Sequence, residues 1–124
     1  MKNISLPFTD LEIQDRLILA RTHQHERISL DKHRQVMQLA KQEFSDQEFA
    51  LILDEANSYS VDFSVLREIR NNPKLKCCAI ISYRLTTQKM LSGIVPALKK
   101  PSKFFRSRND AIQWAKSQLK TNDN

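Results

Sequence analysis

Short apolar runs alternate along this chain with longer segments in which apolar residues recur every three or four positions. The longest uninterrupted apolar runs are Phe49–Leu53 and Cys77–Ile81. Runs of this length are typical of strands that are buried on both faces, whereas the longer period is typical of amphipathic helices. Strands that are joined through helices tend to lie parallel in one sheet. The alternation therefore predicts an α/β domain.

Two strands open the expected fold. Leu11 and Ile13 alternate with polar residues, and the apolar run 17–20 follows a plausible turn at Asp15-Arg16. So short a joint indicates an antiparallel hairpin. Further strands are expected at 49–53, 77–83 and 103–105. The segment before Phe49 is ambiguous, because Ser45 and Glu48 have the spacing of a capping box that would start a helix; the shortness of the apolar run favours a strand.

Four helices are expected between these strands and after them. They cover Leu30 to Phe44 after a Ser29 cap, Asp62 to Arg70, a segment from Thr86 or Thr87 to Leu98 that Gly93 and Pro96 interrupt, and the stretch after Ser107, which forms a capping box with Asp110. The order is β-β-α-β-α-β-α-β-α. We expect one domain over residues 1–120, with a mixed sheet of about five strands flanked by helices, and a disordered tail over 121–124.

Composition excludes several classes of protein. The 124 residues are 40% hydrophobic and 27% charged, as in an ordinary globular domain. No apolar run approaches the roughly twenty residues of a membrane-spanning helix. The first twelve residues lack the apolar core of a signal peptide, and a single glycine excludes glycine-rich or P-loop designs. We expect a cytoplasmic protein.

The two cysteines, Cys77 and Cys78, are adjacent. Neighbours on a strand point to opposite faces, and a disulfide between them would be strained. We expect one thiol to face the core on each side of a central strand. A vicinal-thiol redox or metal site is the alternative.

Charge is distributed unevenly along the chain. Residues 1–62 carry seven basic and eleven acidic side chains, whereas residues 63–124 carry thirteen basic and three acidic ones. Five cations are candidates for anion binding: Lys99, Lys100, Lys103, Arg106 and Arg108. Phe104 and Phe105 interrupt them, and aromatic side chains among cations can bind single-stranded nucleic acid. The alternative is that the charges spread over the surface and that at least one of these phenylalanines belongs to the core.

Other reactive side chains form weak patterns. His23, His25, Glu26 and His33 could ligate a divalent metal, but no further ligand follows at a standard spacing. Asp54-Glu55 ends a buried strand, where α/β sheets place ligands, yet no nucleophile or glycine-rich loop accompanies it. We expect a solvated strand end there. The sequence predicts no catalytic residue, no metal site and no cofactor.

The closing segment carries a resemblance. After Lys100-Pro101, the run FFRSRNDAIQWAKSQL resembles the end of bacterial SpoIIAA-like proteins, which are related to STAS and CRAL-TRIO domains. The matching positions are Phe105, Ser107, Asp110, Ala111 and Trp114. Segments 28–37, 51–60 and 77–83 fit the helix and strands upstream, so the similarity covers about residues 11–120.

This resemblance implies a regulatory or protein-binding module rather than an enzyme. In the anti-sigma antagonists of this family, the helix after the central strand contacts the partner and begins with Asp followed by a phosphorylated Ser. Here Asp62 matches, Phe63 stands at the serine position and Ser64 is the nearest hydroxyl, so the phosphoswitch motif is not intact. The candidates for partner binding are Asp62, Phe63, Ser64, Arg67 and Arg70. Homodimerisation stays open.

A third function is a carrier of an apolar ligand. The apolar residues of the segment before Pro101 could cover a hydrophobic pocket: Met90, Leu91, Ile94, Val95 and Leu98. The resemblance to CRAL-TRIO relatives implies lipid or another hydrophobic molecule as the ligand. Packing of these residues into the core is the simpler interpretation.

Overall fold

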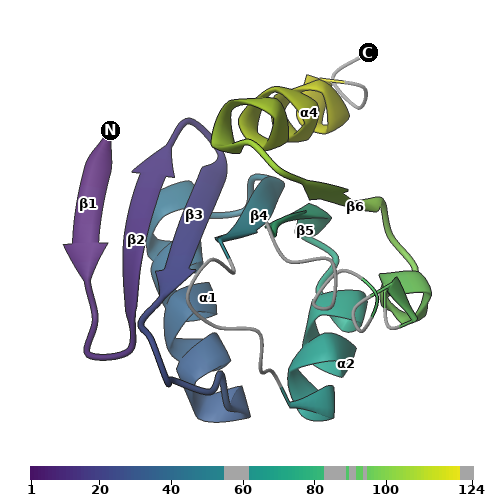
Figure 1. Ribbon diagram of the computed structural model, residues 1–124. Helices are drawn as coiled ribbons and strands as arrows, with labels where there is room; N and C mark the ends of the chain where they lie inside the picture. Colours follow the sequence, from purple (N-terminus) through teal and green to yellow (C-terminus); the bar gives the residue numbers. More distant parts are fainter. Residues whose placement is uncertain (55–61, 83–88, 90–91, 94, 121–124) are drawn as a thin grey trace.

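The computed structural model describes residues 1–54, 62–82, 89, 92–93 and 95–120. The elements, shown in Figure 1, are β1 (Lys2–Ser5), β2 (Thr9–Gln14), β3 (Leu17–Thr22), α1 (Leu30–Phe44), β4 (Phe49–Asp54), α2 (Phe63–Asn71), β5 (Leu75–Ile81), the 3₁₀ helix η1 (Val95–Leu98), β6 (Ser102–Phe105) and α4 (Arg108–Lys120). Within these residues no helix has the length and apolar character needed to cross a membrane.

The strands form one six-stranded sheet in the order β1-β2-β3-β4-β5-β6. β1, β2 and β3 are antiparallel, whereas β3, β4, β5 and β6 are parallel. The mixed α/β class is confirmed, and so is the hairpin, whose turn places Asp15 at a φ of 52°.

The expected strand count was one too low. β1 escapes sequence analysis because Lys2, Asn3 and Ser5 are polar and only Ile4 packs against the core. An edge strand of four residues needs a single inward side chain, so it shows no apolar run.

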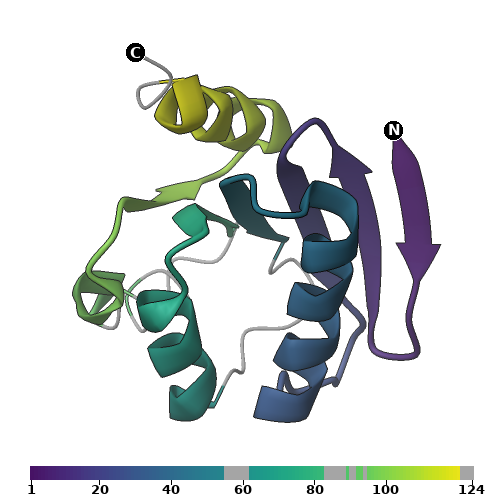
Figure 2. The ribbon, with the colours of Figure 1, turned by 180° about the vertical axis from the view of Figure 1, so that it is seen from behind.

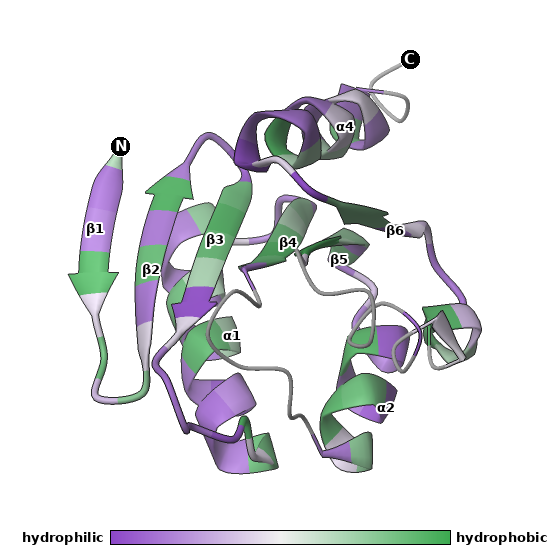
Figure 3. Cartoon of the chain, in the orientation of Figure 1, coloured by the Kyte–Doolittle hydropathy of each residue, from purple (hydrophilic) through white to green (hydrophobic). Residues whose placement is uncertain are grey.

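The sheet separates two layers of core. α1 and α2 pack on one face, where Leu51 and Ile18 meet Val36 and Ile69. α4 packs on the other face, where Ile52 and its neighbours meet the small side chains of the helix. Figure 2 shows α1 and α2 together in front of the sheet. Figure 3 shows the apolar character of β3, β4 and β5 between these layers.

The cysteine prediction is confirmed. Cys77 packs under α4, and its neighbour Cys78 packs with Ile80 and Val95 on the opposite face. Both cysteines are buried, and they form no disulfide with each other.

The predicted helix starts and stops agree closely with the structure. Ser29 accepts a hydrogen bond from the backbone N–H of Lys32 at 3.3 Å, and Ser107 accepts one from Asp110 at the same distance. α1 ends at Phe44 as expected, and α2 ends at Asn71, two residues before Pro73. Within α2, Val65 and Ile69 are buried, and Leu66 is half-buried against the same core.

The ambiguous segment before Phe49 leads into a strand, as favoured. Two expected strands differ slightly in length: β5 begins at Leu75, and β6 begins at Ser102 and forms an edge of the sheet. The expected helix from Thr86 or Thr87 to Leu98 lies mainly outside the described residues; Lys89 and Ser92 are helical, and η1 holds the buried Leu98. Glu55, Tyr83 and the tail 121–124 also lie outside the described residues.

Candidate functional site

The first turn of α2 exposes a large apolar side chain. Phe63 is 80% exposed, and among the described residues Met1 is the only other large apolar side chain that is exposed. α2 buries Val65 and Ile69, which lie one turn apart on the face toward the sheet. Phe63 precedes Val65 by two positions, and two positions turn a helix by about 200°, so its ring points to the opposite side.

Two arginines continue this surface. Arg67 follows Phe63 by four positions, the spacing at which helical side chains are neighbours, and Arg70 is also exposed. Neither arginine forms an ion pair with a described residue, although Arg70 Nε donates a hydrogen bond of 3.3 Å to Asn71. We define Phe63, Arg67 and Arg70 as the α2 face.

The acidic residue that follows Arg67 in α2 is paired with a cation of α1. Glu68 accepts a hydrogen bond of 2.8 Å from Arg34 of α1. This bond holds the pKa of the Glu68 carboxyl below its ordinary value. The α2 face therefore keeps a positive charge.

Grooves run along both sides of α2. One groove, of about 490 Å³, lies between α1 and α2 and is lined by Leu30, Met37 and Ser64 among others. The second, of about 240 Å³, lies between α2 and the segment around η1, with Phe63 and Ala97 in its wall. Arg67 lines both grooves, so the α2 face forms a ridge between two depressions.

The remaining candidates on α2 lie apart from this ridge. Asp62 occupies the cap position, but its side chain pairs with Arg27 at 2.6 Å instead of capping the helix. Its backbone N–H donates to the carbonyl of Ile28 at 3.2 Å. Ser64 is half-buried and faces the groove toward α1. Asp62 thus joins α2 to the segment before α1.

The structure divides the five candidate anion-binding cations. Lys100 Nζ donates hydrogen bonds to the carbonyls of Asn72 and Leu75, at 2.9 and 2.8 Å, and burial lowers the pKa of this amine. Arg108 pairs with Glu12 of β2. The exposed members are Lys99, Lys103 and Arg106.

Both aromatic residues between these cations are half-buried and pack against core residues. Phe104 packs against Ile80 on one face of the sheet, and Phe105 packs against Trp114 on the other, with ring centroids 5.5 Å apart. Lys103 Nζ lies 5.6 Å from the centre of the Phe105 ring. Rings held in this way leave few faces for stacking on bases.

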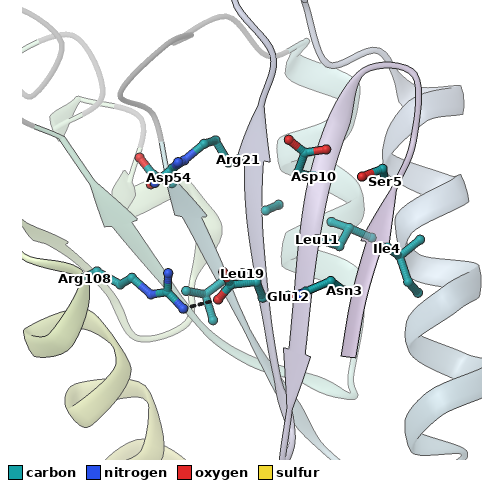
Figure 4. Close-up of a pocket in the computed structure, with 11 residues that line it drawn as sticks. Asn3, Ile4, Ser5, Asp10, Leu11, Glu12, Leu19, Arg21, Asp54 and Arg108 are labelled. Carbon is teal, nitrogen blue, oxygen red and sulfur yellow. Dashed lines mark hydrogen bonds and ion pairs between the residues drawn. The ribbon is translucent and has the colours of Figure 1, made fainter. Parts of the chain in front are cut away.

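A polar pocket of about 240 Å³ lies on the face of β1, β2 and β3 beside α4 (Figure 4). Arg21 and Asp54 stand at one end of it, and Arg108 meets Glu12 at the other. Asp54 is only 7% exposed, so the expected solvated strand end is wrong for this residue. The reason is that Arg21, opposite in register on β3, compensates its charge.

The histidines considered for metal binding have separate roles. His23 donates from Nδ1 to the carbonyl of Pro7 at 3.1 Å, and its Nε2 lies 3.2 Å from Asp10. The hydrogen bond with Asp10 raises the pKa of His23. His33 lies on the buried side of α1, and burial lowers its pKa to about 4. No three His, Cys, Asp or Glu side chains in the described part of the chain are arranged to hold a metal ion.

No protein-family model matches the chain, and no curated protein matches it in sequence. Among solved structures it is similar to the crystal structure of an uncharacterised protein from Shewanella loihica, a member of the DUF3478 family with a SpoIIAA-like fold. The TM-score is 0.61 over 86% of this chain and 91% of that chain, with 14% sequence identity. The chain has a SpoIIAA-like fold. The resemblance of the closing segment is confirmed as a likeness of fold.

The α2 face occupies a defined place in this SpoIIAA-like fold, on the helix that follows β4 in the chain and precedes β5. Its three residues were all predicted as candidates, whereas the contribution of α1 was not. Leu30 and Met37 of α1 are both half-buried at the groove beside α2. The pairing of Arg34 with Glu68 joins residues 34 positions apart and has no local signal in the sequence.

Proposed function

We propose that this chain is a non-enzymatic regulatory module of the cytoplasm that binds an acidic segment of a partner protein on the α2 face. The observation that carries the proposal is the exposed ring of Phe63 beside Arg67 and Arg70. Burial of a phenylalanine side chain contributes about 1.5–3 kcal/mol. Aromatic and arginine side chains are also enriched among the residues that dominate the energy of protein interfaces.

Charge favours an acidic partner. Arg67 and Arg70 have no acidic neighbour paired with them among the described residues, and Glu68 is occupied by Arg34. Carboxylates of a partner would form ion pairs with these arginines, and complementary charge speeds association. The ridge between two grooves suits a partner segment that contacts Phe63 and crosses Arg67, which lines both grooves.

The pairing of charges in the polar pocket supports a binding role. The charged side chains that line the polar pocket are paired with one another or with His23: Arg21 with Asp54, Arg108 with Glu12, and Asp10 with His23. These charges are therefore compensated within the protein. Phe63 also replaces the hydroxyl that a phosphoswitch would need.

The test is affinity capture from a lysate of the source organism with three baits: the native chain, Phe63→Ala and Arg67→Glu/Arg70→Glu. A matched control, Lys103→Glu/Arg106→Glu, makes the same charge change on the exposed cations near β6. We expect the native chain and the control to retain one acidic protein that survives nuclease. Both α2 variants should bind the purified partner about tenfold more weakly or worse.

Other outcomes would overturn the proposal. Equal retention by the α2 variants excludes the α2 face. Recovery that disappears with nuclease, or with the control variant alone, assigns the function to nucleic acid and the basic residues. A lipid in native mass spectra would indicate the carrier function. Sedimentation of the purified chain checks whether the partner is a second copy.

A further inference from the structure

A small cavity lies between the sheet and the N-terminal half of α1. Its volume is about 30 Å³. Apolar side chains, including Phe8, Val36 and Leu51, form most of its wall. Thr9 of β2, Thr22 of β3 and His33 of α1 supply polar groups.

Two polar atoms at this cavity lack partners. Thr9 Oγ1 and His33 Nε2 are buried and have no hydrogen-bond partner, and they are the only such side-chain atoms among the described residues. Thr9 is 1% exposed and His33 is 4% exposed. A buried polar atom without a hydrogen bond destabilises the folded state, so native structures rarely keep one. Both exceptions in the described part of this chain line the same cavity.

We propose that this cavity binds one ordered water molecule that bridges Thr9 Oγ1 and His33 Nε2. The cavity exceeds the roughly 10–15 Å³ of free space that one buried water molecule requires. A buried water also requires two or more polar partners, and the two unpartnered atoms provide them. The same volume is too small for a lipid or another apolar ligand.

The chemistry of the two side chains fits this ligand. A threonine hydroxyl rotates, so it donates to a water or accepts from one. Neutral histidine presents one nitrogen as a donor and the other as an acceptor, and a water satisfies Nε2 in either state. Burial favours the neutral imidazole, and the charged groups that act on His33 are Glu68 of α2 and Arg34 of α1. The water would connect the sheet to α1 at a place where protein atoms make no direct hydrogen bond between these two side chains.

The first test is a stability measurement on Thr9→Val, a substitution of nearly equal size. If the hydroxyl binds a water, the variant loses a hydrogen bond, and the equilibrium constant for folding falls about tenfold. If the cavity is dry, valine removes an unsatisfied hydroxyl, and the variant is as stable as the native chain or more stable. That result would overturn the proposal.

A double-mutant cycle separates the bridge from general effects of substitution. We expect Thr9→Val to have a clearly smaller effect in the His33→Leu background than in the native one, because the water has then already lost a partner. Additive effects would contradict the bridge. A crystal structure of the native chain at about 1.5 Å resolution tests the proposal without any variant. Water density within hydrogen-bond distance of both atoms supports the proposal, and a dry cavity overturns it.

Discussion

Arg21 and Asp54 lie opposite each other in register at the carboxyl ends of the parallel strands β3 and β4. Arg21 donates two hydrogen bonds to Asp54 Oδ2, from Nε at 3.1 Å and from Nη2 at 3.0 Å. The carboxylate is buried, whereas the arginine side chain is 56% exposed. The buried Asp54 carboxylate is therefore compensated by an arginine side chain that stays in contact with water.

Removal of the Arg21 guanidinium should destabilise the fold. Arg21→Met leaves Asp54 buried without its cation, and we expect the free energy of unfolding to fall by about 2 kcal/mol. Urea unfolding at pH 7 measures the change. Arg21→Met/Asp54→Asn is the matched control and should recover part of the loss. An Arg21→Met variant as stable as the native chain would show that the cation is dispensable.

Phe63 should contribute to binding without contributing to folding. Phe63→Ala removes a side chain that contacts water, so we expect the free energy of unfolding to change by less than about 0.5 kcal/mol. Ile69→Ala, on the buried side of the same helix, should cost about 2–5 kcal/mol. The comparison is made by chemical denaturation. A large loss of stability in Phe63→Ala would place the ring in the core and remove the argument for the α2 face.

Acid should weaken the fold through His33. Its folded pKa of about 4 lies below the ordinary value of 6.5, so the unfolded chain binds the proton first. The stability that this histidine contributes is complete above pH 6.5 and is lost as the pH falls toward 4, by up to about 3 kcal/mol. Denaturation at several pH values measures the slope between these limits, and His33→Leu should reduce it.

His23 gives an internal contrast in the same experiment. Its pKa is raised by Asp10, so an NMR titration should place its midpoint above 6.5 and that of His33 below. Asp10→Asn should lower the midpoint of His23 alone. Equal midpoints for His23 and His33 in the native chain would contradict both environments.

Lys100 should behave as a structural residue despite its place in a basic segment. Its amine donates to two carbonyls at the start of β5 and just before it, so Lys100→Met should reduce stability by about 2 kcal/mol. Lys103→Met, on the exposed side of β6, is the matched control and should have little effect. Thermal unfolding of the two variants distinguishes them. Equal melting temperatures of the two variants would show that the Lys100 amine does not stabilise the fold.

The sequence predicted the elements whose signals are local. The apolar runs of β4 and β5, the cap at Ser29 and the stop at Pro73 each require only neighbouring residues. β1 was missed because its one inward side chain, Ile4, meets Leu11 through pairing that no local pattern encodes.

Site residues show the same division. Sequence analysis identified Phe63 from its position in a resemblance, but its exposure depends on which side of α2 meets the sheet. Val65 and Ile69 are buried on that side, and Leu66 packs beside them against the core. The burial of Lys100 was not foreseen, because its partners lie 28 and 25 residues away. Long-range contacts thus decide which cations stay available to a ligand.

The two adjacent cysteines give each layer of the molecule its own chemical reporter. Cys77 faces α4, and Cys78 faces the opposite layer. A thiol reacts with an alkylating reagent only when it meets solvent as a thiolate, and burial raises the pKa of Cys77 to about 11. The labelling rate of each single-cysteine version would therefore measure how often the elements above that thiol detach. The labelling rates of these two adjacent residues would then report separately on how often each face of the sheet is exposed.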